Sequence, residues 1–154
     1  GLRKLERAGF VHRDVRPQNV LVFGDCLVEH GCHVKLGDLG HACDYDVLGR
    51  SELEAAGTPL YMAPEVWTKR GSMRKIDVWA VGMIAYEMFV GGCPAALLSL
   101  DFEKAGKLSE HPFRHYIPEE FDIWKDERFQ AFWREDAEIA NLIRGMLTKP
   151  VWRR

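Results

Sequence analysis

The chain has 154 residues, of which 47% are hydrophobic, and this suits one globular unit with a core of its own. Its 21 basic and 23 acidic residues give a net charge of −2. The chain therefore lacks the excess of basic residues that would favour nucleic acid or an anionic membrane as its main partner. The most apolar stretch, residues 78–90, contains Glu87 and is shorter than the roughly 20 apolar residues of a membrane span, which favours a buried helix.

The first half of the chain predicts short strands and loops. Residues 1–7 have the pattern of the end of an amphipathic helix and not of a signal peptide. Residues 20–23 and 33–36 are short β-type runs separated by turn residues, so they predict a hairpin. Residues 37–64 contain glycines and a Thr-Pro step but little periodicity, which predicts a long loop of the kind that is usually functional.

The second half predicts helices. Asp77 opens an almost wholly apolar segment that continues to Met88, and we expect this helix to be buried on all sides, with Asp77 as its N-terminal cap. A polar, aromatic-rich region follows at 99–133. Its tryptophan-rich stretch, 124–133, could be a docking surface, although aromatic residues such as Phe129, Phe132 and Trp133 are more often helix core. The last predicted helix, 136–147, places five apolar residues on one face: Ile139, Leu142, Ile143, Met146 and Leu147.

Five short motifs follow one another in a fixed order between residues 12 and 153. They are His12-Arg13-Asp14-Val15-Arg16-Pro17-Gln18-Asn19, Asp38-Leu39-Gly40, Gly57-Thr58-Pro59-Leu60-Tyr61-Met62-Ala63-Pro64-Glu65, Asp77-Val78-Trp79-Ala80-Val81-Gly82 and Pro150-Val151-Trp152-Arg153. The first four resemble the catalytic loop, the Asp-Phe-Gly motif with Leu for Phe, the end of the activation segment and the central helix of protein kinases, and the fifth resembles the end of their C-lobe.

The resemblance implies an α+β, mainly α fold: the C-lobe of the protein-kinase-like fold with a small β-hairpin at its active-site face. We find no Gly-rich loop, strand Lys or helix Glu to grip ATP, so the N-lobe is expected to be absent. Residues 1–154 are then a partial kinase domain, from the catalytic loop to near the end of the C-lobe, and inactive by themselves.

The resemblance also assigns roles to single residues. Asp14 would accept the proton of the substrate hydroxyl, and Asn19 and Asp38 would hold Mg²⁺ through oxygen ligands. Leu21 would form the floor under the adenine of ATP, with Ile84 and Met88 beneath it. His12 and Leu39 would belong to a stacked apolar column that links the active-site motifs to Asp77, which would also hold the backbone of the catalytic loop.

Two positions bear on the substrate. Arg16 stands where serine/threonine kinases usually carry a Lys that contacts the transferring phosphate, and Arg offers a planar fork in place of a point charge. The Thr58 hydroxyl would hydrogen-bond Asp14, and Pro17 with Gly57-Thr58 favours the serine/threonine class. We therefore expect a cytoplasmic serine/threonine protein kinase that binds ATP, Mg²⁺ and a protein substrate. A pseudokinase-like scaffold module is the alternative, and the oligomeric state stays open.

Two ion pairs are expected around the activation segment. The resemblance pairs Glu65 with Arg153, for which Arg154 could substitute. Glu54, near Glu52, stands where many kinases carry a phosphosite and could pair with Arg13, although both glutamates could equally be solvated. Ser51 and Tyr45 are candidate phosphosites.

The four cysteines form no obvious disulfide framework, which indicates a reducing, intracellular setting. Cys26 and Cys32, with His30 and His33, have a spacing compatible with zinc, but the sequence contains no pair of Cys-x-x-Cys motifs. An ordinary, somewhat long hairpin is the favoured interpretation of this stretch.

Overall fold

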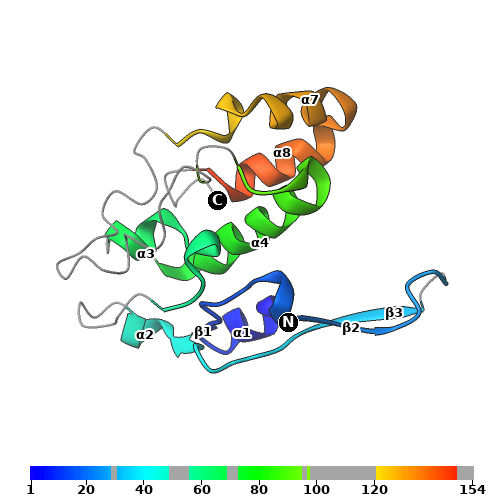
Figure 1. The fold of residues 1–154 in the computed structure, drawn as a ribbon. Coiled ribbons are helices and arrows are strands. Elements are labelled where there is room, and N and C mark those ends of the chain that lie inside the picture. The colour runs from blue at the N-terminus through cyan, green and yellow to red at the C-terminus, as the bar shows by residue number, and fades with distance from the viewer. Residues whose placement is uncertain (29–30, 49–55, 69–72, 95–96, 98–120, 149–154) are drawn as a thin grey trace.

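The computed structural model describes residues 1–28, 31–48, 56–68, 73–94, 97 and 121–148 (Figure 1). Helix α1 (Leu2–Arg7) begins the chain and confirms the helix expected there. It leads to a short strand, β1 (Phe10–Val11), which pairs antiparallel with β4 (Cys43–Asp44). This pairing brings the entrance of the catalytic-loop motif beside the segment that follows Asp38-Leu39-Gly40.

The predicted hairpin is present. Strand β2 (Val20–Gly24) pairs antiparallel with β3 (Cys32–Leu36), with Val20 opposite Leu36 and Gly24 opposite Cys32. In Figure 1 the two strands form a ribbon that extends away from the helices. Its apolar side chains are accordingly exposed, among them Leu21, Val22, Phe23 and Val34.

The region predicted as one long loop contains more structure than its sequence indicates. Strand β4 and helix α2 (Tyr45–Leu48) lie in its first part, and a 3₁₀ turn, η2 (Pro59–Tyr61), lies in its last part. Helix α3 (Pro64–Thr68) and a further 3₁₀ turn, η3 (Met73–Lys75), then lead to the central helix. Such short elements carry too few periodic residues to be recognised from the sequence alone.

Helix α4 (Ile76–Tyr86) forms the centre of the core and continues into a π-helical turn, η4 (Glu87–Gly91). Trp79, Met83 and Tyr86 are completely buried, so the predicted buried helix is confirmed over most of its length. The expectation that burial extends to Met88 is wrong, because that side chain is 74% exposed. Among the described residues, no helix is both long and apolar enough to cross a membrane.

Two amphipathic helices pack beside α4. Helix α7 (Glu127–Glu135) follows a 3₁₀ turn, η6 (Ile123–Lys125), and α8 (Ala137–Met146) follows α7 directly. Each begins at an Asp whose carboxylate accepts a backbone N–H of the first turn, Asp126 from Arg128 and Asp136 from Ile139. Gly82 lets α4 approach α8 closely, since a Cβ there would lie 2.8 Å from the Cβ of Met146.

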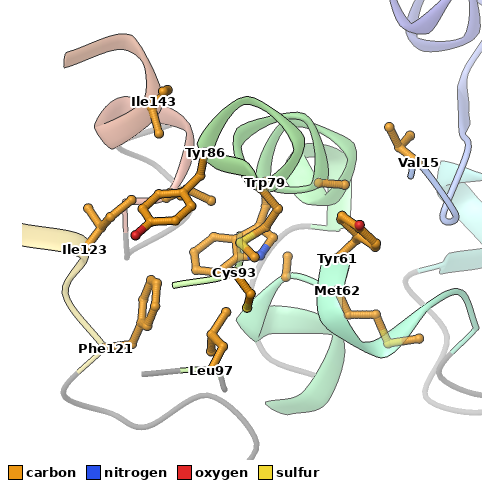
Figure 2. Packing of buried hydrophobic residues seen from close by; sticks show 14 of the residues in the cluster. Val15, Tyr61, Met62, Trp79, Tyr86, Cys93, Leu97, Phe121, Ile123 and Ile143 are labelled. Carbon is orange, nitrogen blue, oxygen red and sulfur yellow. The ribbon is translucent and has the colours of Figure 1, made fainter. Parts of the chain in front are cut away.

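Figure 2 shows how aromatic and aliphatic side chains fill the space around α4. The rings of Trp79 and Phe121 are 5.5 Å apart, and the Tyr86 ring stacks on Phe129 at 6.1 Å. Phe129 is fully buried, so the core interpretation of the aromatic stretch at the start of α7 is confirmed. In α8, Ile143 is buried but Leu142 is 63% exposed, so its predicted place on the buried face is wrong.

Candidate active site

The catalytic-loop motif is anchored by Asp77. One carboxylate oxygen accepts the backbone N–H of His12 at 2.8 Å, and the other accepts the N–H of Arg13 at 3.0 Å. Burial raises the pKa of Asp77, and these two bonds oppose the rise. The predicted capping role is wrong, since Lys75 stands at the start of α4 and the Asp77 carboxylate is directed to the loop. The predicted backbone-holding role is confirmed.

His12 connects the loop to the base of the hairpin. The ring is fully buried, its Nδ1 accepts the N–H of Asp14 at 3.3 Å, and its Nε2 lies 2.9 Å from the Gly37 carbonyl oxygen. A ring protonated at Nε2 satisfies both contacts. Gly37 in turn donates its N–H to the carbonyl of Asn19 at 2.8 Å. These bonds fix Asn19, Asp14 and the residue before Asp38 relative to one another.

The Asp14 carboxylate accepts several hydrogen bonds and also lies beside a positive charge. Its Oδ1 accepts both the N–H and the hydroxyl of Thr58, each at 2.8 Å. Its Oδ2 accepts the Asn19 amide at 3.0 Å, and the same amide donates to the Asp14 carbonyl at 2.8 Å. Arg16 Nε lies 3.4 Å from Oδ2, a Coulombic contact rather than a hydrogen bond. The structure therefore brings together the four residues predicted to be catalytic.

These contacts set the charge of Asp14. Its side chain is only 5% exposed, and burial alone would raise its pKa. The two bonds from Thr58, the charge of Arg16 and the Asn19 amide outweigh burial, so the pKa lies below its ordinary value. Asp14 is consequently an ionised carboxylate at neutral pH, able to accept a proton or orient a hydroxyl.

The backbone is strained where these motifs meet. Arg13 (φ 71°) and Asp38 (φ 56°) occupy the left-handed region although neither is glycine. Gly57 (φ 113°) packs against the Arg13 carbonyl oxygen so closely that a Cβ would collide with it. Such conformations cost energy and concentrate at functional sites, where surrounding contacts hold them.

A small cavity of about 10 Å³, enough for one water-sized group, lies beside Asp14. The catalytic loop, the segment after Gly57 and the first turns of α4 enclose it, and its lining includes Thr58, Tyr61, Ile76 and Asp77. The carboxylate of Asp14 is thus held at a junction of three elements.

A comparison with known protein families shows to which family this chain belongs. The family profile described as "Protein kinase domain" matches residues 1–154. The chain belongs to this family. The predicted recognition from five ordered motifs is therefore confirmed.

Individual relatives of this kinase domain are serine/threonine-protein kinases by name. Serine/threonine-protein kinase atg1 of Dictyostelium discoideum is 44% identical over 91 residues, which cover 59% of this chain and 13% of that protein. Serine/threonine-protein kinase polo of Drosophila melanogaster is 36% identical over 94 residues, 61% of this chain and 15% of that protein. Inactive serine/threonine-protein kinase PLK5 of Mus musculus is 38% identical over 100 residues, 65% of this chain and 16% of that protein. Each match thus spans only a small part of the relative's length.

The two predicted magnesium ligands of the kinase domain lie at the base of the hairpin. Asn19 precedes β2, and Asp38 follows Gly37, whose N–H is bonded to Asn19. The Asn19 side-chain nitrogen is bonded to Asp14, so its amide oxygen is the atom that would bind a metal. The Asp38 carboxylate is exposed and accepts the Gly40 N–H at 3.2 Å. Two oxygen donors completed by phosphates and waters suit Mg²⁺, and the described residues form no group of three or more His, Cys, Asp or Glu around a metal position.

Other predicted members of the site are exposed in this structure. Leu21, the predicted adenine floor, is 45% exposed and its side chain lies against Gly37. Met88 was expected to pack beneath Leu21, but its side chain is exposed to solvent, so this expectation is wrong. The apolar column is half formed, because His12 is buried whereas Leu39 is 56% exposed. The hairpin extends away from the helices, which leaves Leu21 exposed (Figure 1).

Sequence reasoning missed one polar contact beside the site. The buried Tyr61 donates its hydroxyl to Glu87, at 2.9 Å from Oε2 and 3.2 Å from Oε1. Burial and the Glu87 carboxylate raise the pKa of Tyr61. The position of Glu87 within an otherwise apolar segment could have predicted such a contact, because a carboxylate among buried side chains needs a polar partner.

The predicted activation-segment pairs mostly lie outside the described residues. Glu65 is described and is 2% exposed, but Arg153 and Arg154 are not among the described residues. Glu52, Glu54 and Ser51 also lie outside them. Tyr45 is half-buried, with the Arg74 guanidinium 4.7 Å from its ring centroid, and burial raises its pKa.

The cysteine prediction requires a correction. Cys26 and Cys32 are joined by a disulfide, whereas Cys43 and Cys93 are free. The predicted absence of a disulfide is therefore wrong, because the hairpin register brings two sequence-near cysteines to the same turn. The bond occupies both sulfurs that a zinc ion at this turn would need.

Proposed function

We propose that this chain is the C-lobe portion of a serine/threonine protein kinase that transfers the γ-phosphate of ATP to Ser or Thr hydroxyls of protein substrates. The observation that carries the proposal is the arrangement at Asp14, where one ionised carboxylate is held by Thr58 from the activation segment and Asn19 from the catalytic loop. Phosphoryl transfer depends chiefly on such positioning and on charge neutralisation.

In this proposal Asp14 acts on the substrate hydroxyl. Thr58 occupies Oδ1 with two donors, which favours one orientation of the carboxylate. The hydroxyl would approach Asp14 on the side of Arg16, whose side chain is one-third exposed and whose guanidinium would contact the transferring phosphate. Because its pKa is lowered, Asp14 is ionised and accepts a hydrogen bond or proton from that hydroxyl.

Asn19 and Asp38 would hold Mg²⁺ with ATP. When bound, the ion neutralises phosphate charge and fixes the phosphates in line with the nucleophile. This chain places Asn19 and Asp38 at the base of opposite arms of the hairpin, and the Gly37–Asn19 bond keeps these arms in register. Leu21 would contact the adenine, and its exposed side chain is free to do so.

The serine/threonine class is supported by Thr58 at Asp14 and by the names of the relatives. Since the chain spans only about 12–16% of the relatives, the activity, the protein substrates and an intracellular location of the whole protein are part of the proposal.

A second candidate is a kinase-like module that binds partners without phosphoryl transfer. One relative, 38% identical, is named an inactive serine/threonine-protein kinase. The intact Asp14, Asn19 and Asp38 favour the enzyme.

The deciding experiment uses the full-length protein with Asp14→Asn. We expect binding of ATP to be retained, with transfer of labelled phosphate to Ser and Thr peptides reduced by about 10²–10⁴-fold, the range of general acid–base contributions. Asp25→Asn is the matched control, since it makes the same chemical change on the exposed hairpin turn. Equal turnover by Asp14→Asn and wild type would refute the role of Asp14, and no turnover by wild type would favour the binding module.

A further inference from the structure

The far end of the β2–β3 hairpin carries the disulfide between Cys26 and Cys32. Their Cα atoms are 4.6 Å apart, and the bond closes a ring across the turn. Cys32 is the residue opposite Gly24 in the ladder, and Cys26 follows Gly24 by two positions. The crosslink therefore begins where the hydrogen-bonded ladder ends.

This pair is more accessible than the buried Cys93, while Cys43 is half-buried. Cys26 is exposed and Cys32 half-buried, and their neighbours Leu27 and Val28 are 97% and 58% exposed. Cys93 is 8% exposed, and burial raises its pKa to about 11, which keeps that thiol unreactive. Thiol–disulfide exchange requires an accessible sulfur, so the hairpin pair meets the condition that Cys93 fails.

The backbone turn holds the two cysteines together. Gly24 has a φ of 89°, and a Cβ there would collide with the Gly31 carbonyl oxygen. A Cβ on Gly31 would in turn collide with the Asp25 carbonyl oxygen. Glycine at both positions allows a turn this tight, and it places Cys26 and Cys32 next to each other through backbone geometry. Re-formation of the bond after reduction is then intramolecular and efficient.

We propose that Cys26 and Cys32 form a reversible dithiol–disulfide modification site, whose exchange partner is a low-molecular-weight thiol or disulfide and whose oxidised state stabilises the hairpin. In reduction, an external thiolate attacks the sulfur of the exposed Cys26, the S–S bond breaks, and Cys32 leaves as a thiolate that takes a proton. A second external thiol displaces Cys26 from the mixed disulfide. The net reaction consumes two thiols and yields the protein dithiol and one low-molecular-weight disulfide; oxidation is its reverse.

The redox state of Cys26 and Cys32 would affect the stability of the hairpin, whose base lies beside Asn19 and Asp38. The hairpin extends from the helices with most of its apolar side chains exposed, so its stability comes chiefly from the ladder and the crosslink. A lone two-stranded hairpin is marginal in water. Closing the ring restricts opening from the tip. The ladder continues from there to Val20–Leu36 and the Gly37–Asn19 bond, beside Asp38.

The first test measures the chemistry without any activity assay. Full-length protein is equilibrated in a series of glutathione buffers that range from fully reduced to fully oxidised, and its free thiols are then blocked by alkylation. The mass of the peptide that contains both cysteines is measured by mass spectrometry. We expect conversion between two alkylated thiols and one internal disulfide, with Cys43→Ser showing the same midpoint. Two free thiols at every ratio, or a disulfide at every ratio, would overturn the proposal. Failure of the proposed kinase activity would leave this readout unchanged.

The second test measures hairpin opening by hydrogen exchange. Reduction is expected to speed exchange of the β2 and β3 amides nearest the tip by about tenfold, while the α4 amides serve as internal reference. The double variant Cys26→Ser/Cys32→Ser should exchange at the reduced rate in either buffer. Equal exchange in the oxidised and reduced wild-type hairpin would overturn the stabilising role.

Discussion

Thr58 Oγ1 lies 2.8 Å from Asp14 Oδ1 although the residues are 44 positions apart, and the Thr58 N–H reaches the same oxygen. One carboxylate oxygen therefore docks the end of the activation segment on the catalytic loop. Gly57 makes this contact possible by allowing the chain to pass against the Arg13 carbonyl. The position of Asp14 consequently depends on the conformation of the segment around Thr58.

Removal of the Thr58 hydroxyl should weaken catalysis more than substrate binding. Thr58→Val keeps the shape and the backbone bond but deletes one hydrogen bond to a charged group, which is worth about 1.5–3 kcal/mol. We expect kcat to fall by about 10- to 100-fold with little change in KM for ATP, measured by steady-state kinetics on the full-length protein. Thr58→Ser retains the hydroxyl and should stay close to wild type. If Val and Ser variants lose activity equally, the hydroxyl is not the positioning group.

The parts of the site that depend on local sequence were predictable. The hairpin was expected from two β-type runs separated by turn residues, while the loop from His12 to Asn19 was recognised because its sequence resembles the kinase catalytic loop. The contact between Thr58 and Asp14 came from the family resemblance, since no local pattern reports a bond across 44 positions.

The wrong predictions have physical causes of three kinds. Asp77 was expected to cap its own helix, but its carboxylate gains two buried backbone donors at positions 12 and 13, which no local propensity describes. Met88 and Leu142 were expected to be buried because apolar periodicity cannot tell which part of a helix face meets a neighbour. The disulfide was missed because the turn that joins Cys26 to Cys32 depends on backbone approach at Gly24 and Gly31.

Loss of the Asp77 carboxylate should destabilise the domain. Asp77→Ala leaves the N–H groups of His12 and Arg13 without this acceptor, and each stranded buried donor costs about 1–3 kcal/mol. We expect a loss of about 2–5 kcal/mol in unfolding free energy by urea denaturation. Asp77→Asn keeps one acceptor oxygen and should lose less. Equal stability of Asp77→Ala and wild type would show that the loop is held by other contacts.

The ionised state of Asp14 predicts a pH-dependent contribution to stability. Its native pKa is lowered below the ordinary 3.8, so its contribution is present above that value and disappears as the pH falls through the native pKa. The difference in melting temperature between wild type and Asp14→Asn should therefore be constant above about pH 5 and shrink toward pH 3. Asp77, whose pKa is raised, is present in both proteins and cancels in the difference. A pH-independent difference would contradict the lowered pKa.

Gly57 offers a test of backbone strain with an internal control. Gly57→Ala introduces a Cβ at a φ of 113°, where it would collide with the Arg13 carbonyl, so we expect a loss of about 1–3 kcal/mol in stability and a reduced kcat as Thr58 is displaced. Gly145→Ala is the matched control, because this glycine lies in α8 with open space around its Cβ position. Alanine there should stabilise by about 0.5–1 kcal/mol through helix propensity and leave kcat unchanged. Urea denaturation and initial-rate kinetics on both variants separate the outcomes. A Gly57→Ala protein as stable and active as Gly145→Ala would show that the catalytic loop can move away from the segment before Thr58 at no cost.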